Sequence, residues 1–224
     1  MGLGNLENQG HRLERENRGL LSVPERHLLD YLVHRLPRWT TPNILTACSA
    51  LGAILCFASY AFAARYSVFL WLVNLGLMIN WFGDSLDGRL ARVRGIDRPA
   101  FGFFLDQSTD VVSQFIFGIG LGLSGYLRFD LAVLGLAAYL LMTIHGLIKT
   151  VVTKKISLAT MGLGLTEVRF LFILANITFY FIPPVPFPFF GAEITYADCC
   201  CGAWILVHLG QFFVCTALEL KRLA

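Results

Sequence analysis

Six apolar stretches, each close to 20 residues long, constrain this chain more than any other feature of its sequence. They cover residues 42–63, 68–90, 101–123, 129–150, 165–182 and 199–219. A helix needs about 20 apolar residues to cross the hydrocarbon of a bilayer, and a chain in lipid must satisfy its backbone hydrogen bonds internally. The pattern therefore predicts an all-α polytopic membrane protein with six transmembrane helices.

The composition favours lipid over water as the solvent of the folded chain. Of the 224 residues, 56% are hydrophobic and only 15% are charged, whereas soluble domains carry roughly 25% charged residues. So few charged side chains cannot cover a water-facing surface. The formal net charge of +3 does not indicate a nucleic-acid partner, and we expect contacts with membrane lipids instead.

The chain before the first apolar stretch divides into two parts. Residues 1–24 are polar and mixed in charge, which predicts a flexible or weakly helical tail. Residues 25–38 carry apolar side chains at helical spacing, which predicts an N-terminal amphipathic helix in the membrane interface. Residues 39–224 form the six-helix transmembrane domain. Because residues 1–40 lack a leading apolar core, we expect no signal peptide.

The basic residues predict the orientation of the spans. Sixteen of the 18 Lys and Arg residues fall on one side of the predicted membrane domain, and only Arg65 and Arg128 fall on the other. Connections rich in basic residues stay in the cytoplasm. We therefore expect an integral, multi-pass protein with both termini in the cytoplasm, together with the connections at residues 90–100 and 150–164.

Four aspartates gather at the cytoplasmic face of this domain. Asp84 and Asp87 end the second stretch, and Asp106 and Asp110 begin the third. Spacings of three and four residues place each pair on one side of a helix, and the short connection at residues 93–100 brings the pairs face to face. Four carboxylates so close together need counter-charge. Oxygen ligands suit Mg²⁺ or Mn²⁺, and two such ions can clamp a transferring phosphoryl group.

The residues around the aspartates fit a phosphate ligand. Gly88, Ala91 and Gly102 have small side chains and leave room for a bulky group beside the metals. Arg92 lies one helical turn after Gly88 and can hold a phosphate oxygen through a bidentate contact. The active site is therefore expected on the cytoplasmic side.

Residues 84–110, DSLDGRLARVRGIDRPAFGFFLDQSTD, resemble the CDP-alcohol phosphotransferase (phosphatidyltransferase) family. The family pattern is Asp, two residues, Asp-Gly, two residues, Ala-Arg, eight or nine residues, Gly, three residues, Asp, three residues, Asp. Every fixed position is matched here, with nine residues in the variable gap. The resemblance implies that the aspartates ligate metal and that Asp110 also acts as general base on an acceptor hydroxyl.

The same resemblance implies where a CDP-linked donor binds. Gly88 and Arg92 would contact its CDP part, and Ala91 would leave clearance beneath the nucleotide. The segment Pro42-Asn43-Ile44-Leu45-Thr46 is similar to a polar patch of the family, so Asn43 and Thr46 would hydrogen-bond the nucleotide. The family commonly forms homodimers, which makes a second copy of the chain an expected partner.

The resemblance leaves the direction of transfer open. A short chain, and Gln107 where the aminoalcohol branch has His, favour CDP-diacylglycerol as donor and a small polar alcohol as acceptor. The alternative, transfer from CDP-choline or CDP-ethanolamine to diacylglycerol, is favoured by a Thr-Glu segment in which Glu167 would face a cationic headgroup. Lys149 and Arg169, if they face the metals, suit an acceptor that bears phosphate or carboxylate.

Other classes of protein fit the sequence less well. A prenyl-diphosphate enzyme would have more spans and two well-separated Asp-rich motifs. A transporter would show broken spans in paired halves, and a non-catalytic scaffold would have lost one of the aspartates.

Overall fold

The computed structural model describes residues 15–16, 22–153, 156–157, 164–189 and 191–223, and most of them are helical. The helices are α1 (Ser22–Arg35), α2 (Pro42–Ala63), α3 (Phe69–Val93), α4 (Pro99–Leu123), α5 (Phe129–Thr153), α6 (Leu165–Phe181) and α7 (Tyr196–Leu223). Helices α2 to α7 follow the six apolar stretches to within about one turn. Among the described helices, α2, α5 and α7 are long and apolar enough by themselves to cross a membrane.

Two small sheets depart from the expectation of a purely helical chain. β1 (Arg15–Glu16) pairs in parallel with β2 (Ile156–Ser157), and β3 (Phe187–Phe189) pairs antiparallel with β4 (Ala192–Ile194). The prolines of residues 183–188 exclude a helix before and within β3, and Gly191, with a φ of 83°, turns the chain into β4. Most of the predicted polar tail, residues 1–14 and 17–21, lies outside the described residues.

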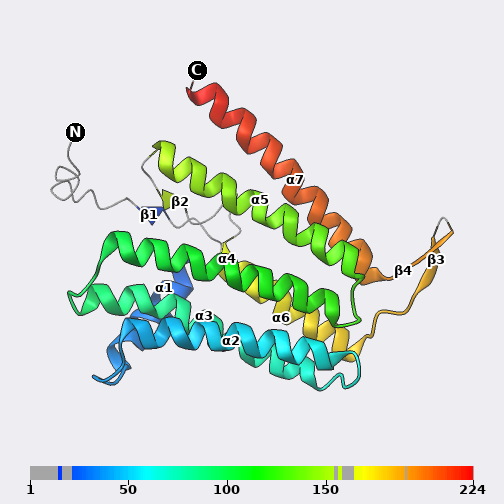
Figure 1. Ribbon diagram of the computed structural model, residues 1–224, viewed down its shortest axis with the longest axis horizontal. Helices are drawn as coiled ribbons and strands as arrows, with labels where there is room; N and C mark the ends of the chain where they lie inside the picture. Colours follow the sequence, from blue (N-terminus) through cyan, green and yellow to red (C-terminus); the bar gives the residue numbers. More distant parts are fainter. Residues whose placement is uncertain (1–14, 17–21, 154–155, 158–163, 190, 224) are drawn as a thin grey trace.

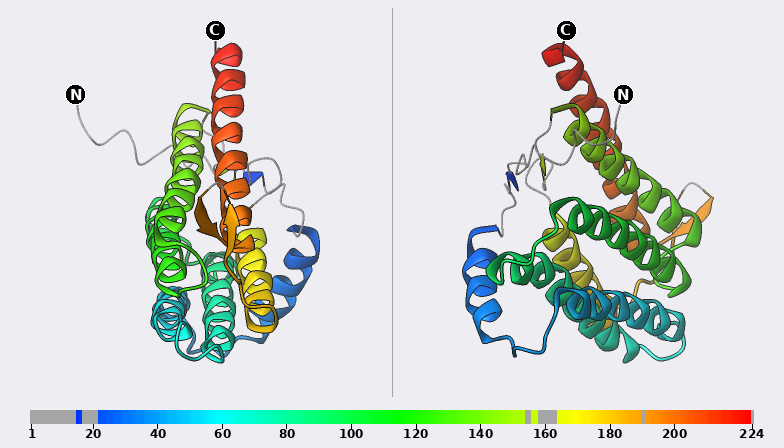
Figure 2. Two further views of the ribbon diagram at one scale, coloured as in Figure 1. Left: turned by 90° about the vertical axis from the view of Figure 1, so that its right-hand side faces the viewer. Right: turned by 60° about the vertical axis from the view of Figure 1, so that its left-hand side comes forward.

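The helices form two groups joined by α4. α2 packs on α3 and α4, and α6 packs on α3. Figure 1 shows these four helices as one bundle. α5 packs on α4 and on α7, and the α5–α7 pair diverges from the bundle (Figures 1 and 2). The main apolar core lies inside the bundle, where Cys56, Tyr60 and Val73 are fully buried.

Glycines let α2 and α3 approach almost backbone to backbone. A Cβ atom on Gly83 would lie 2.3 Å from the carbonyl oxygen of Leu45 and 2.6 Å from the backbone nitrogen of Ser49. One added to Gly52 would lie 2.5 Å from the backbone nitrogen of Asn80. Because Asp84 directly follows Gly83, this contact fixes the backbone of α3 from which the first aspartate of the motif projects.

The turn after α3 has the form of a Schellman motif. Gly95 has a φ of 65°, its N–H donates to the carbonyl of Arg92, and the N–H of Ile96 donates to that of Ala91. A residue without Cβ adopts this left-handed conformation at little cost. Pro99 then occupies the first turn of α4, where a missing N–H costs nothing. The predicted helical hairpin is thus closed by local sequence.

A helix lies in the region predicted to be amphipathic at residues 25–38, but α1 spans Ser22–Arg35 and packs on protein. Leu29 and Val33 are 4% and 3% exposed and contact Leu45, Leu86 and Leu90 of α2 and α3. The apolar side of α1 that these residues form therefore faces the bundle rather than lipid. Its location in the membrane interface remains a prediction.

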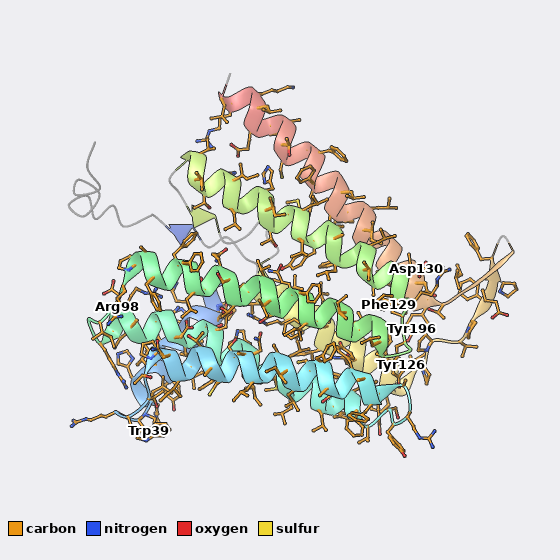
Figure 3. All side chains as sticks on the ribbon, viewed as in Figure 1. Trp39, Arg98, Tyr126, Phe129, Asp130 and Tyr196 are labelled. Carbon is orange, nitrogen blue, oxygen red and sulfur yellow. The ribbon has the colours of Figure 1, made fainter. Side chains whose placement is uncertain are left out.

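Aromatic residues lie at both ends of the helical bundle, as the labelled side chains of Figure 3 show. Trp39 and Arg98, which flank α2 and α4 at their starts, lie at one end, and Tyr126, Phe129 and Tyr196 lie at the other. Aromatic residues commonly mark both surfaces of a bilayer. The α1–α2 and α3–α4 connections consequently share one end of the fold.

We predict that Gly83→Ala lowers the free energy of unfolding by about 1–3 kcal/mol, because the new methyl group must push α2 away from α3. Thermal unfolding in detergent measures the change. Gly146→Ala is the matched control, since no atom of the described part of the chain lies within 4 Å of a Cβ at that helical position. This variant should be neutral or slightly stabilising. Equal loss in both variants would contradict the close packing.

Candidate active site

Three of the four motif aspartates converge between α3 and α4. Asp84, Asp106 and Asp110 each offer a carboxylate oxygen, and these oxygens lie within 4.8 Å of one another. Asp110 is 7% exposed, whereas Asp84 and Asp106 are half-buried. We refer to these three side chains as the aspartate cluster.

The fourth aspartate is held by α2. Thr46 donates a hydrogen bond of 2.6 Å to Oδ2 of Asp87, and the N–H of Gly88 donates to its Oδ1. Thr46, which is predicted to contact the nucleotide, and Asp87, which is predicted to ligate metal, are therefore bonded to each other. The role of Asp87 as a metal ligand remains a prediction.

Arg169 of α6 provides positive charge to the cluster. Its Nη2 lies 2.8 Å from Oδ2 of Asp84 and 3.8 Å from Oδ1 of Asp110. The residue is only 5% exposed. A buried guanidinium is stable only when it is paired and hydrogen-bonded, so Arg169 and the two carboxylates stabilise one another in this position.

Asn80, which is not among the site residues predicted from the sequence, completes the surroundings of Arg169. Its Oδ1 accepts from Nε of Arg169 at 2.8 Å, while its Nδ2 donates to the hydroxyl and the carbonyl of Ser49 at 2.8 and 3.0 Å. A longer contact of 3.4 Å reaches the hydroxyl of Ser113. The signal was available: Asn80 is a polar residue in an apolar run, four residues before Asp84 and hence on the same helical face.

The residues expected to contact the nucleotide lie at the same end of α2 and α3. Asn43 is exposed at the start of α2, and Gly88 and Ala91 are half-buried on α3. The guanidinium of Arg92 lies beside Gly88, because Nη1 would be 3.5 Å from a Cβ added there. No atom lies within 4 Å of the corresponding position on Gly102 among the described residues, which leaves room there for a ligand.

The three residues proposed for acceptor binding are placed differently from one another. Arg169 contacts the aspartate cluster. Lys149 forms an ion pair with Glu219 of α7. Glu167 is 8% exposed, and its Oε2 accepts from the backbone N–H of Gly164 at 2.9 Å, which caps the start of α6.

The chemistry of the cluster fits a divalent cation. Mg²⁺ binds oxygen at about 2.0–2.1 Å, so two ligands of one ion lie within about 4 Å of each other. Carboxylate oxygens separated by no more than 4.8 Å reach this spacing through small side-chain rotations. Carboxylates this close repel one another, and a divalent cation relieves that repulsion.

We predict that Asp106→Asn weakens Mn²⁺ binding at least about tenfold, as loss of a ligand from an oxygen site should. Titration of the purified protein in lipid nanodiscs, followed by electron paramagnetic resonance, measures this affinity. Asp130→Asn is the control, since Asp130 is exposed and paired with Arg128 at the other end of the molecule. Unchanged Mn²⁺ affinity in Asp106→Asn would remove this residue from the metal site.

Comparison with known proteins agrees with the motif. The model of the family "CDP-alcohol phosphatidyltransferase" matches residues 39–211. The chain is similar to the archaetidylinositol phosphate synthase of Pyrococcus horikoshii, with 38% identity over 96 residues, or 43% of this chain and 48% of that protein. The match thus spans about half the length of this curated relative. The resemblance predicted from residues 84–110 is confirmed, and the chain belongs to the CDP-alcohol phosphatidyltransferase family.

Proposed function

We propose that this protein transfers a phosphatidyl-type group from a CDP-linked lipid donor of the CDP-diacylglycerol class to a hydroxyl of a small polar alcohol, with release of CMP. The observation that carries the proposal is the aspartate cluster, which forms from residues of the matched family motif. Family membership supports a transferase of phospholipid synthesis, and the retention of all four aspartates argues against a non-catalytic scaffold.

The proposed mechanism relies on charge and position. Asp84, Asp106 and Asp110, together with Asp87 as a further predicted ligand, would hold two divalent ions, Mg²⁺ or Mn²⁺. Such ions would neutralise the charge of the donor diphosphate. A carboxylate oxygen of Asp110 takes the proton of the acceptor hydroxyl. The acceptor oxygen then bonds to the β-phosphorus, the bond from this phosphorus to the bridging oxygen breaks, and CMP leaves with the electron pair.

We assign the donor nucleotide to the start of α2 and the end of α3, where Asn43, Gly88 and Arg92 lie. Asn43 is exposed there, and the guanidinium of Arg92 lies beside Gly88, which has no side chain of its own. A guanidinium is suited to hold a pyrophosphate oxygen. Ala91 gives clearance, and Thr46 connects this region to Asp87. A bidentate arginine contact fixes the orientation of a phosphate as well as its position.

We propose that the acceptor bears an anionic group. Arg169 reaches the aspartate cluster from α6, and the similar protein of Pyrococcus horikoshii is named for an inositol phosphate lipid. Glu167, the residue that favoured an aminoalcohol substrate, is engaged as the cap of α6. Lys149 and Glu167 stay predictions as acceptor contacts.

We further propose six membrane spans, α2 to α7, with the active site and both termini in the cytoplasm and α1 at the membrane surface. The distribution of Lys and Arg residues supports this orientation. The positions of Trp39 and Arg98 at the site's end of the molecule agree with it (Figure 3). A homodimer remains a prediction from family resemblance.

Asp110→Asn should lower the rate of CMP release by at least about 100-fold, the lower range for loss of a general base, while binding of the CDP-linked donor is largely retained. Radiolabelled CDP-diacylglycerol, Mg²⁺ or Mn²⁺ and an alcohol acceptor are incubated with protein in lipid, and CMP is quantified. Asp130→Asn serves again as control. Full activity of Asp110→Asn would eliminate its role as base.

The identity of the acceptor is tested separately with a panel of alcohols. We expect an acceptor that carries phosphate, such as inositol phosphate or glycerol phosphate, to release CMP at least about tenfold faster than inositol, glycerol or serine. Hydrogen bonds to charged groups contribute about 1.5–3 kcal/mol, which corresponds to roughly tenfold or more in rate. A preference for a neutral alcohol would refute the anionic acceptor. If no donor and acceptor pair yields CMP, the proposed transfer reaction is refuted.

A further inference from the structure

The helix α1 lies outside residues 39–211, the part of the chain that the family model matches, yet it reaches the surroundings of the active site. We propose that Glu25 of α1 is a positioning residue, which holds α3 and α6 in the register where Arg169 bonds to Asp84. Glu25 and its two bonding partners, Trp81 and Thr166, lie outside the motif of residues 84–110. Only the first of the two tests below rests on the metal-binding part of the proposed function.

A single carboxylate oxygen of Glu25 joins the two helices. Oε1 accepts a hydrogen bond of 2.9 Å from Nε1 of Trp81 on α3 and one of 2.8 Å from the hydroxyl of Thr166 on α6. Trp81 precedes Asp84 by three residues, and Thr166 precedes Arg169 by three residues. Each donor therefore lies one helical turn from one member of the buried ion pair.

The body of α1 is docked without the help of Glu25. Leu29 and Val33 are buried against α2 and α3, and Asp30 pairs with Arg89 of α3. Glu25 lies four residues before Leu29, so it projects from the same side of α1 that faces the bundle. Replacement of Glu25 should thus leave α1 in place and remove its connection to α6.

The start of α6 is where such a connection has an effect. Arg169 lies in the second turn of this helix, which spans Leu165–Phe181 and packs on α3. The Arg169–Asp84 bond of 2.8 Å depends on the axial position of the start of α6 relative to α3. Hydrogen bonds to an ionised carboxylate are stronger than neutral ones, and two of them to one oxygen oppose a change in this position.

The position of Arg169 sets how well the aspartate cluster can accept a cation. Its guanidinium bonds Asp84 and lies 3.8 Å from Asp110, so it occupies ligand oxygens and repels a divalent ion. If Glu25 holds Arg169 in place, loss of Glu25 should tighten metal binding. A general loss of structure would weaken it, which makes the direction of the change diagnostic.

The first test is Mn²⁺ affinity of the full chain in lipid nanodiscs, measured by electron paramagnetic resonance without substrate. Glu25→Ala should tighten Mn²⁺ binding about threefold, which lies at the low end of the interaction energies measured between neighbouring residues. In a protein that also carries Arg169→Gln, the same change should have no effect on Mn²⁺ affinity. Glu25→Gln keeps an acceptor oxygen and should remain within about twofold of the parent. Asp30→Ala, which loosens α1 from α3 alone, is the matched control and should not tighten binding.

The second test needs no metal. Thermal unfolding in detergent with a chelator is measured for the parent, Glu25→Ala, Arg169→Gln and the double variant. We expect the two single shifts in melting temperature to sum to more than the shift of the double variant, because both remove the same arrangement of α6. Additive shifts, or a Mn²⁺ effect of Glu25→Ala that persists without Arg169, would overturn the proposal. If the parent binds no Mn²⁺, the metal site fails, and the unfolding cycle alone decides the role of Glu25.

Discussion

The ion pairing of Arg169 with Asp84 and Asp110 is the interaction on which the structure of the site depends. Carboxylates and a guanidinium this buried are stable only with partners, because a charge without one is costly in a medium of low dielectric constant. Arg169 is 5% and Asp110 is 7% exposed. Three helices, α3, α4 and α6, must therefore keep one arrangement around these charges.

Close packing of the helices fixes the positions of the residues around the aspartate cluster. The glycine contact of Gly83 with α2 fixes the helix that carries Asp84, and the turn at Gly95 returns the chain so that α4 presents Asp106 and Asp110. Asn80 links Arg169 to Ser49 of α2. The four helices of the bundle thus meet in one hydrogen-bonded layer at the base of the site, which limits the movement of its carboxylates.

A second polar layer lies deeper in the same bundle and has a structural role. Tyr60 donates to Asn176 at 2.9 Å, and Asn176 donates to Asn74 at 2.8 Å. These side chains from α2, α3 and α6 are buried and bonded to each other, as polar groups away from water must be. Hydrogen bonds in such surroundings specify which helices pair, a selection that apolar contacts in lipid make only weakly. The layer thereby helps α6 present Arg169 at its other end.

The sequence by itself determined the six long helices, the turn between α3 and α4 and the residue types of the site. Apolar length placed the helices, Gly95 and Pro99 shaped the turn, and spacings of three and four residues placed each pair of aspartates on one helical face, because all of these follow from contacts within a few residues. Packing of α3 and α4 on α2 then brought Asp84 together with Asp106 and Asp110. The tertiary structure alone decided which partners the charges take. Arg169 and Asp84 are 85 residues apart, and Glu25 and Thr166 are 141 apart. No periodicity encodes such pairs: they depend on the lateral order of helices, and this order follows from backbone approach at glycines and from buried hydrogen bonds that form only in the packed bundle.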